Sequence, residues 1–151
     1  MKKTRLRNLS FVLLFGILSV LPALSYAAAP TRVPEPVKVN ASGGSYTNIM
    51  PAQLKQMLAA KDFLFVNVHI PYEGEIVPTD AFIPYDEVER NRAKFPQDKD
   101  AKILLYCRTG RMSAIAAEKL VQLGYTNVWN LKGGMIAWEE TGMPVVIHKP
   151  R

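Results

Sequence analysis

One stretch of the chain has the residue types and spacing of a reactive anion site. Cys107 directly follows a short apolar run, Ile103–Tyr106, and Arg108 and Arg111 come shortly after it. The apolar run is typical of a strand buried in a parallel sheet. The next segment, Ser113–Leu123, has its apolar residues at helical spacing. Cys107 is therefore expected at the lip of a strand-to-helix loop.

A cysteine in such a loop is expected to be reactive. The backbone N–H groups of the loop and the positive end of the helix dipole point to one centre. Thiolates are the nucleophilic form of cysteine, and this setting favours them. Cys107 is the only cysteine, so it forms no intrachain disulfide. The alternative is an inert cysteine packed in the core, which is common.

The rest of the loop is expected to bind the substrate. Arg111 is the candidate for anion recognition, because a guanidinium binds oxyanions through paired hydrogen bonds. Arg108 fits this role and a solvated surface position equally well. Thr109 and Ser113 can donate hydroxyl hydrogen bonds, although Ser113 is also an ordinary helix N-cap. The remaining two loop residues, Gly110 and Met112, contribute backbone N–H groups, and Met112 adds an apolar wall.

Two segments resemble the single-domain rhodanese family. They are Tyr106–Ser113 and Leu131–Trp138, which reads Leu-x-Gly-Gly-x-x-x-Trp, and the resemblance covers residues 46–146. It implies that Cys107 takes a sulfane sulfur from a small anionic donor such as thiosulfate and becomes a persulfide. The sulfur then passes to a thiol or cyanide acceptor, or to a protein acceptor, and no cofactor is expected.

The chain departs from the family pattern after an earlier strand. The usual Asp-Val-Arg is Asn67-Val68-His69 here, and Gly-His-Ile is Gly74-Glu75-Ile76. In the family this strand is next to the central one, which implies that His69 lies near the base of the cysteine loop. His69 is then either a general base for the thiol or a replacement for a structural arginine. Lys132 either adds charge to the pocket rim or is simply exposed.

Two other functions stay open. Cysteine phosphatases have an arginine six residues after the cysteine, and that position is Ser113 here. The loop Cys107–Met112 has the length seen in sulfur-transferring rhodaneses, whereas members that handle phosphate or arsenate have one residue more. A phosphatase or arsenate reductase is thus disfavoured. The second alternative is a persulfide carrier or binding module that turns over few small donors.

The remaining pattern predicts an α/β, rhodanese-like three-layer fold. Its five-stranded, mainly parallel sheet should be covered by helices on both faces. The expected strands are 46–49, 63–68, 81–83, 103–106 and 127–131, and the expected helices are 51–60, 85–95, 113–123 and 133–142. No group of His, Cys and carboxylate residues has metal-ligand spacing, so no metal is expected.

The first 27 residues have the pattern of a secretory signal peptide. A basic start precedes an apolar run, residues 11–21, and Ser25-Tyr26-Ala27 offers a cleavage site. The apolar run is shorter than the roughly 20 residues that span a bilayer. We therefore expect a periplasmic or secreted protein that meets the membrane only if the signal stays uncleaved. A Pro- and Gly-containing linker, 28–44, a domain, 45–147, and a tail, 148–151, should follow.

Charge gives little support for nucleic-acid binding. The formal net charge is +6, but removal of residues 1–27 lowers it to +2, because this segment holds four basic residues and no acidic one. No basic stripe interleaved with aromatic residues remains in the mature chain. We expect no nucleic-acid partner.

Overall fold

The computed structural model describes residues 32–147, which belong to one compact unit that starts at Arg32. The expected signal peptide, 1–27, and the expected tail, 148–151, lie outside the described residues. Among residues 32–147, no helix has both the length and the apolar character needed to cross a membrane.

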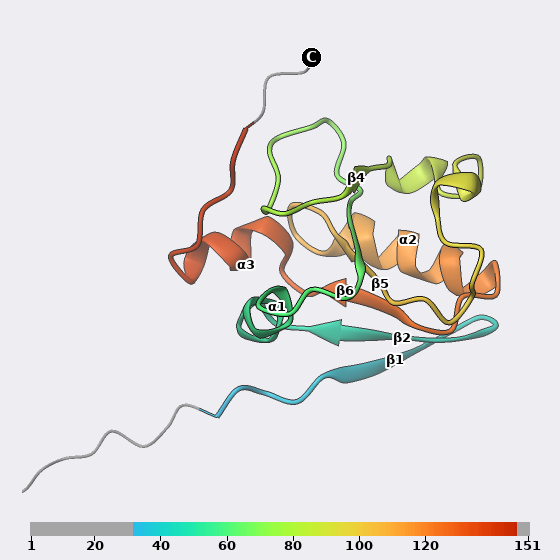
Figure 1. Ribbon diagram of the computed structural model, residues 1–151, viewed down its shortest axis with the longest axis horizontal. Coiled ribbons are helices and arrows are strands. Elements are labelled where there is room, and N and C mark those ends of the chain that lie inside the picture. The colour runs from blue at the N-terminus through green and yellow to red at the C-terminus, as the bar shows by residue number, and fades with distance from the viewer. Residues whose placement is uncertain (1–31, 148–151) are drawn as a thin grey trace, which may run out of the picture. The chain divides into compact units, whose positions relative to one another are not determined.

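The sheet is mixed and has six strands in the order β1-β2-β6-β5-β3-β4 (Figure 1). The strands are β1 (Val37–Ala41), β2 (Gly44–Ile49), β3 (Leu64–Asn67), β4 (Ala81–Phe82), β5 (Ile103–Tyr106) and β6 (Val128–Leu131). Only β1 and β2 pair in antiparallel fashion, and the other neighbours are parallel. The α/β fold class is confirmed.

Strand β1 corrects the expected linker and the expected number of strands. Residues 37–41 lie within the segment predicted as a linker, yet they form a hairpin with β2. The alternation of Val37, Lys38, Val39 and Asn40 has the period of a strand. Gly43 has a φ of 91° in the hairpin turn, a conformation that favours glycine. The prolines ahead of this segment masked that signal.

Three α-helices cover the sheet: α1 (Pro51–Leu58), α2 (Arg111–Gln122) and α3 (Gly134–Glu140). The helix expected over 85–95 is absent, and two short 3₁₀ helices, η1 (Tyr85–Glu87) and η2 (Arg92–Lys94), replace it. The Glu87 carbonyl accepts from both the Asn91 backbone N–H, at 2.9 Å, and the Asn91 side chain, at 3.0 Å. Val88 and Phe95 are nevertheless buried.

The two faces of the sheet bury separate apolar clusters. Ile103 and Leu105 belong to the cluster that contains α2 residues, together with Cys107. Leu104 and Tyr106 belong to the cluster that contains α1 and α3 residues, including Trp138. Figure 1 shows α2 set apart from α1 and α3. Because both faces are covered, every residue of β5 is buried.

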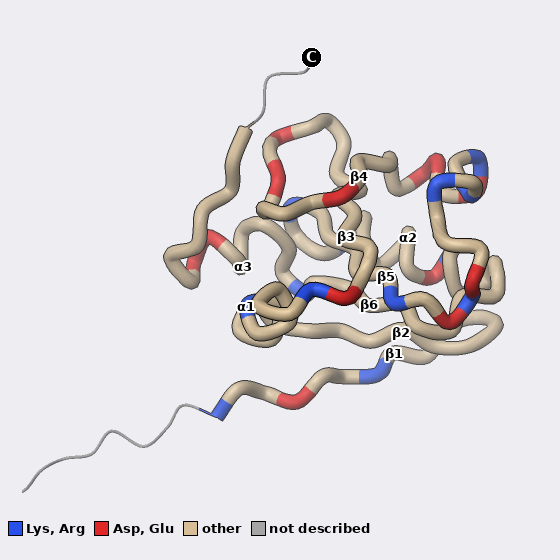
Figure 2. Tube along the Cα trace, in the orientation of Figure 1, with Lys and Arg blue, Asp and Glu red and all other residues tan. Residues whose placement is uncertain are grey.

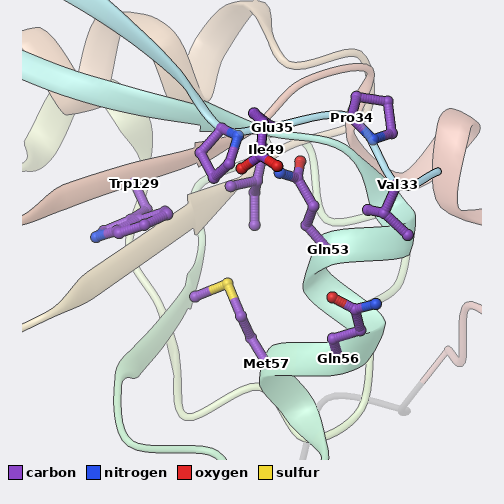
Figure 3. Close-up of a pocket in the computed structure, with 9 residues that line it drawn as sticks. Val33, Pro34, Glu35, Ile49, Gln53, Gln56, Met57 and Trp129 are labelled. Carbon is purple, nitrogen blue, oxygen red and sulfur yellow. The ribbon is translucent and has the colours of Figure 1, made fainter.

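A surface pocket of about 340 Å³ lies beside α1 (Figure 3). Its walls come from the segment Val33–Pro36, from α1, from Ile49 at the end of β2 and from Trp129 of β6. None of these residues belongs to the cysteine loop, so this pocket is separate from the candidate site.

Candidate functional site

Cys107 lies where the sheet meets a helix. It is the first residue after β5, and α2 begins four residues later at Arg111. Gly110 caps α2 with a φ of 87°, and a Cβ there would lie 2.9 Å from the backbone nitrogen of Gly133. Only glycine suits this conformation and this close approach. The predicted strand, loop and helix are therefore present, although α2 begins two residues earlier than expected.

Two groups, one from the loop and one from α2, donate hydrogen bonds to the Cys107 sulfur. The Gly110 backbone N–H lies 3.1 Å from Sγ, and the Ser113 hydroxyl lies 3.4 Å from it. Ser113 is inside α2 and does not cap it, which corrects the N-cap alternative. Both groups can donate to a negatively charged sulfur, and a charged acceptor makes the stronger hydrogen bond.

The thiol is buried beneath the loop and does not lie at its exposed lip, where the sequence predicted it. Cys107 is only 1% exposed, and it packs in the same cluster as residues of α2. The sequence placed it at the lip because a strand end next to a helix start is usually open. In the structure this strand end is closed, and the Gly110 N–H and the Ser113 hydroxyl both lie within hydrogen-bond distance of the sulfur.

The start of α3 holds the other side of the loop. The Met135 N–H donates to the Cys107 carbonyl at 2.9 Å, and the Ile136 N–H donates to the Arg108 carbonyl at 3.0 Å. A Cβ at Gly134 would overlap the Cys107 carbonyl oxygen and would come within 2.6 Å of the Arg108 carbonyl group. Sequence reasoning assigned no site role to Gly134. The only signal was the Gly-Gly pair at the helix start.

The predicted site residues differ in their exposure. Gly110 and Ser113 are buried, Met112 is half-buried, and Arg108, Thr109, Arg111 and Lys132 are exposed. Within the described part of the chain, Arg111 and Lys132 make no ion pair. Arg111 is thus an uncompensated cation at the first position of α2. The exposure of Lys132 favours a simple surface position over a role at the pocket rim.

Arg108 is held by a carboxylate from outside the loop. Its guanidinium donates a short hydrogen bond to Glu73, which lies 35 positions earlier in the chain. Glu73 comes from the loop between β3 and β4, where Figure 2 shows several acidic positions. The hydrogen bond from Arg108 lowers the pKa of the Glu73 carboxyl below its usual value, partial desolvation opposes this, and the charge of Arg108 adds to it. Sequence reasoning missed Glu73.

His69 contacts Glu73, whereas the donors to Sγ are Gly110 and Ser113. Its Nε2 lies 3.3 Å from Glu73 Oε2, the oxygen that also accepts from Arg108. The ring is buried, and among the described residues neither ring nitrogen has a partner with hydrogen-bond geometry. This arrangement favours the replacement of a structural arginine over a general base for the thiol.

Asn67 and Tyr106 fix the loop that carries Glu73. The Asn67 side chain donates to the Gly74 carbonyl at 2.8 Å and accepts from the His69 N–H at 3.0 Å. The Tyr106 hydroxyl accepts from the Ile76 N–H at 3.0 Å. Burial raises the pKa of Tyr106 above its usual value, so the hydroxyl stays neutral. Asn67, which stands where the family usually has Asp, therefore shapes the loop between β3 and β4 in this chain.

No obvious metal centre accompanies the thiol: within residues 32–147, no three His, Cys, Asp or Glu side chains gather closely enough to hold an ion. Chemically, the arrangement offers one sulfur nucleophile with two hydrogen-bond donors, and the next helix begins at the exposed Arg111. Such a set can attack an electrophilic sulfur and hold the resulting anion.

The sequence profile of the rhodanese-like domain matches residues 50–141. A sulfurtransferase of Allochromatium vinosum is 36% identical over 96 residues, which cover 62% of this chain and 88% of that protein. A probable adenylyltransferase/sulfurtransferase of Mycobacterium tuberculosis is 31% identical over 67% of this chain, but this match spans 26% of its length. The crystal structure of a rhodanese-related protein from Thermoplasma volcanium is 32% identical, with a TM-score of 0.57, and the match covers 67% of this chain and 98% of that one.

Proposed function

Because the chain belongs to the rhodanese-like domain family, we propose that it transfers sulfane sulfur through a persulfide on Cys107. The observation that carries the proposal is the pair of donors on Sγ, from Gly110 at 3.1 Å and Ser113 at 3.4 Å. The relative named a sulfurtransferase supports the same reaction class.

The reaction has two displacement steps. The Cys107 thiolate attacks the outer sulfur of thiosulfate, the S–S bond of thiosulfate breaks, and sulfite leaves with the bonding electron pair. The persulfide anion that forms lies among the N–H groups of residues 108–112. A thiol or cyanide then attacks the outer sulfur, and the Cys107 thiolate leaves with its electron pair. No net oxidation occurs and no cofactor is required.

Arg111 orients the anionic donor in this proposal. It is exposed at the start of α2 and unpaired among the described residues, while Arg108 is engaged by Glu73. A guanidinium can bind two oxygens of a sulfonate-like group at once. Thr109 is also exposed, and its hydroxyl can donate a hydrogen bond to the thiosulfate anion.

Steady-state turnover of thiosulfate and cyanide tests the proposal. We expect thiocyanate from the wild-type domain and none from Cys107→Ser. Turnover that survives in Cys107→Ser would contradict the proposal. A wild-type protein that accepts one sulfur from a persulfidated protein but makes no thiocyanate would favour the persulfide carrier, the principal alternative.

The loop also argues against phosphoryl chemistry. The position six residues after Cys107 holds Ser113, whose hydroxyl donates to Sγ, and an arginine there would be needed to bind a phosphoryl group. We expect no hydrolysis of aryl phosphates. Hydrolysis by the wild type that is lost in Cys107→Ser would overturn this point and support the phosphatase alternative.

Export is a further part of the proposal and rests on the amino-terminal sequence alone. The basic start, the apolar run and the Ser25-Tyr26-Ala27 site favour a periplasmic or secreted protein with its mature terminus at Ala28. Intact-mass measurement of protein recovered from a bacterial periplasm tests this. The full-length chain in the membrane fraction would contradict it.

A further inference from the structure

The cation closest in sequence to the thiol is already paired. Arg108 directly follows Cys107, and its guanidinium donates to Glu73 Oε2. Both side chains reach solvent, with 53% of Arg108 and 37% of Glu73 exposed. A carboxylate from another loop therefore neutralises the cation that directly follows Cys107.

Glu73 is held in place by contacts on both sides. Before it, His69 Nε2 lies 3.3 Å from the same Oε2. After it, the Gly74 carbonyl accepts from Asn67 at 2.8 Å, and Glu75 forms an antiparallel bridge with Val146. The backbone bonds of that bridge are 2.8 and 2.9 Å long. Glu73 therefore belongs to a segment whose backbone is fixed by hydrogen bonds. Its position near Arg108 does not depend on the surface ion pair alone.

The geometry points to Glu73 as a positioning residue that sets the charge selectivity of the cysteine site. Its carboxylate cancels the charge of Arg108 and repels anionic reagents that approach Cys107. This inference rests on the proposed sulfur transfer. It adds which class of sulfur donor reaches the Cys107 thiol. Anionic donors that bind Arg111 must approach the site against the charge of Glu73, whereas uncharged reagents do not feel this repulsion.

Alkylation of Cys107 tests this without any sulfur transfer. Iodoacetate and iodoacetamide have similar size and both react with the thiolate, so the ratio of their rate constants cancels thiol access and ionisation. The ratio reports the local potential alone. We expect the rate constant for iodoacetate, divided by that for iodoacetamide, to rise about threefold in Glu73→Gln. This is the size of effect that one unit charge has at several ångströms in a water-like dielectric. High salt should shrink the difference.

Two variants control the measurement. Asp62→Asn removes another exposed carboxylate that is paired with a cation, since Asp62 contacts Lys102 at 2.7 Å ahead of β5. It should leave the ratio unchanged, because this pair lies at the opposite end of β5 from Cys107. Glu73→Asp keeps the charge and should keep the ratio near the wild-type value. A ratio that does not move in Glu73→Gln, or that moves equally in Asp62→Asn, would overturn the inference.

Thiosulfate kinetics give the second readout. We expect Glu73→Gln to lower KM about threefold while kcat stays near the wild-type value, because the charge that repels thiosulfate is removed. A fall in kcat with an unchanged KM would mean that Glu73 only supports the loop, and would overturn the inference. If the wild type turns over no thiosulfate, the proposed function fails, and the alkylation ratio still decides the role of Glu73.

Discussion

The Met135 backbone N–H donates to the Cys107 carbonyl oxygen at 2.9 Å, so α3 begins directly on the backbone of the cysteine loop. This contact ties two segments that are distant in the sequence. Gly134 makes it possible, because any side chain there would occupy the space of the loop backbone. The pairing of the cysteine motif with the Leu-x-Gly-Gly motif thus has a packing cause.

Gly134→Ala should therefore damage both stability and activity. Its Cβ would overlap the Cys107 carbonyl, and overpacking of this kind costs about 1–3 kcal/mol. Gly142→Ala is the matched control, since Gly142 has a φ of 78° but nothing within 4 Å of its Cβ position. Urea unfolding of both variants measures the difference. Equal losses in the two would mean that backbone strain, and not the contact with the loop, is responsible.

Arg111→Ala should weaken the use of thiosulfate. Loss of a charge-assisted hydrogen bond of about 1.5–3 kcal/mol corresponds to roughly 10- to 150-fold in kcat/KM, expressed mainly in KM. Arg92→Ala, at an exposed arginine of η2, should have no effect. Steady-state kinetics with both variants checks this. Wild-type kinetics in Arg111→Ala would move donor binding to Arg108 or Lys132.

Asn67→Asp should destabilise the fold, although Asp is the family's usual residue. The Asn67 amide donates to the Gly74 carbonyl at 2.8 Å, and a carboxylate would instead oppose that oxygen. An unsatisfied buried group costs about 1–3 kcal/mol. The control is Asn48→Asp, because Asn48 Oδ1 accepts from Asn130 at 2.8 Å and a carboxylate can keep that role. Denaturant unfolding at neutral pH measures both variants. Equal losses in their midpoints would contradict this explanation.

Arg108→Gln should raise the pKa of the Glu73 carboxyl toward its ordinary value. The hydrogen bond from Arg108 holds that pKa low in the folded protein. Because the folded-state pKa is depressed, the pair stabilises the fold above the pKa of the unfolded state, and this stabilisation is lost as pH falls through the folded-state pKa. An NMR titration of the Glu73 carboxyl in both proteins tests this, and identical titration curves would contradict it.

Local patterns predicted the central part of this fold. The apolar run of β5 and the helical spacing after Cys107 gave the strand, the loop and the helix, because both periodicities depend on neighbouring residues. Gly124, with a φ of 88°, ends α2 as a left-handed glycine should. The true cap, Gly110, was missed, because the close approach that excludes a side chain there is to Gly133, a residue distant in the sequence.

Long-range contacts explain what the sequence did not reveal. Glu73 and Arg108 are 35 positions apart, and their pairing depends on the shape of the loop between β3 and β4. That shape comes from Asn67, Tyr106 and the bridge to Val146, none of which has a periodic signature. The burial of Cys107 likewise follows from the way the loop closes.

Intact-mass measurement after incubation with thiosulfate tests the central claim most directly, because Cys107 is the only cysteine. The account predicts that the wild-type protein gains the mass of one sulfur atom, that cyanide removes it, and that Cys107→Ser gains nothing. A wild-type mass that stays unchanged, or an equal gain in Cys107→Ser, would contradict sulfur transfer through a Cys107 persulfide.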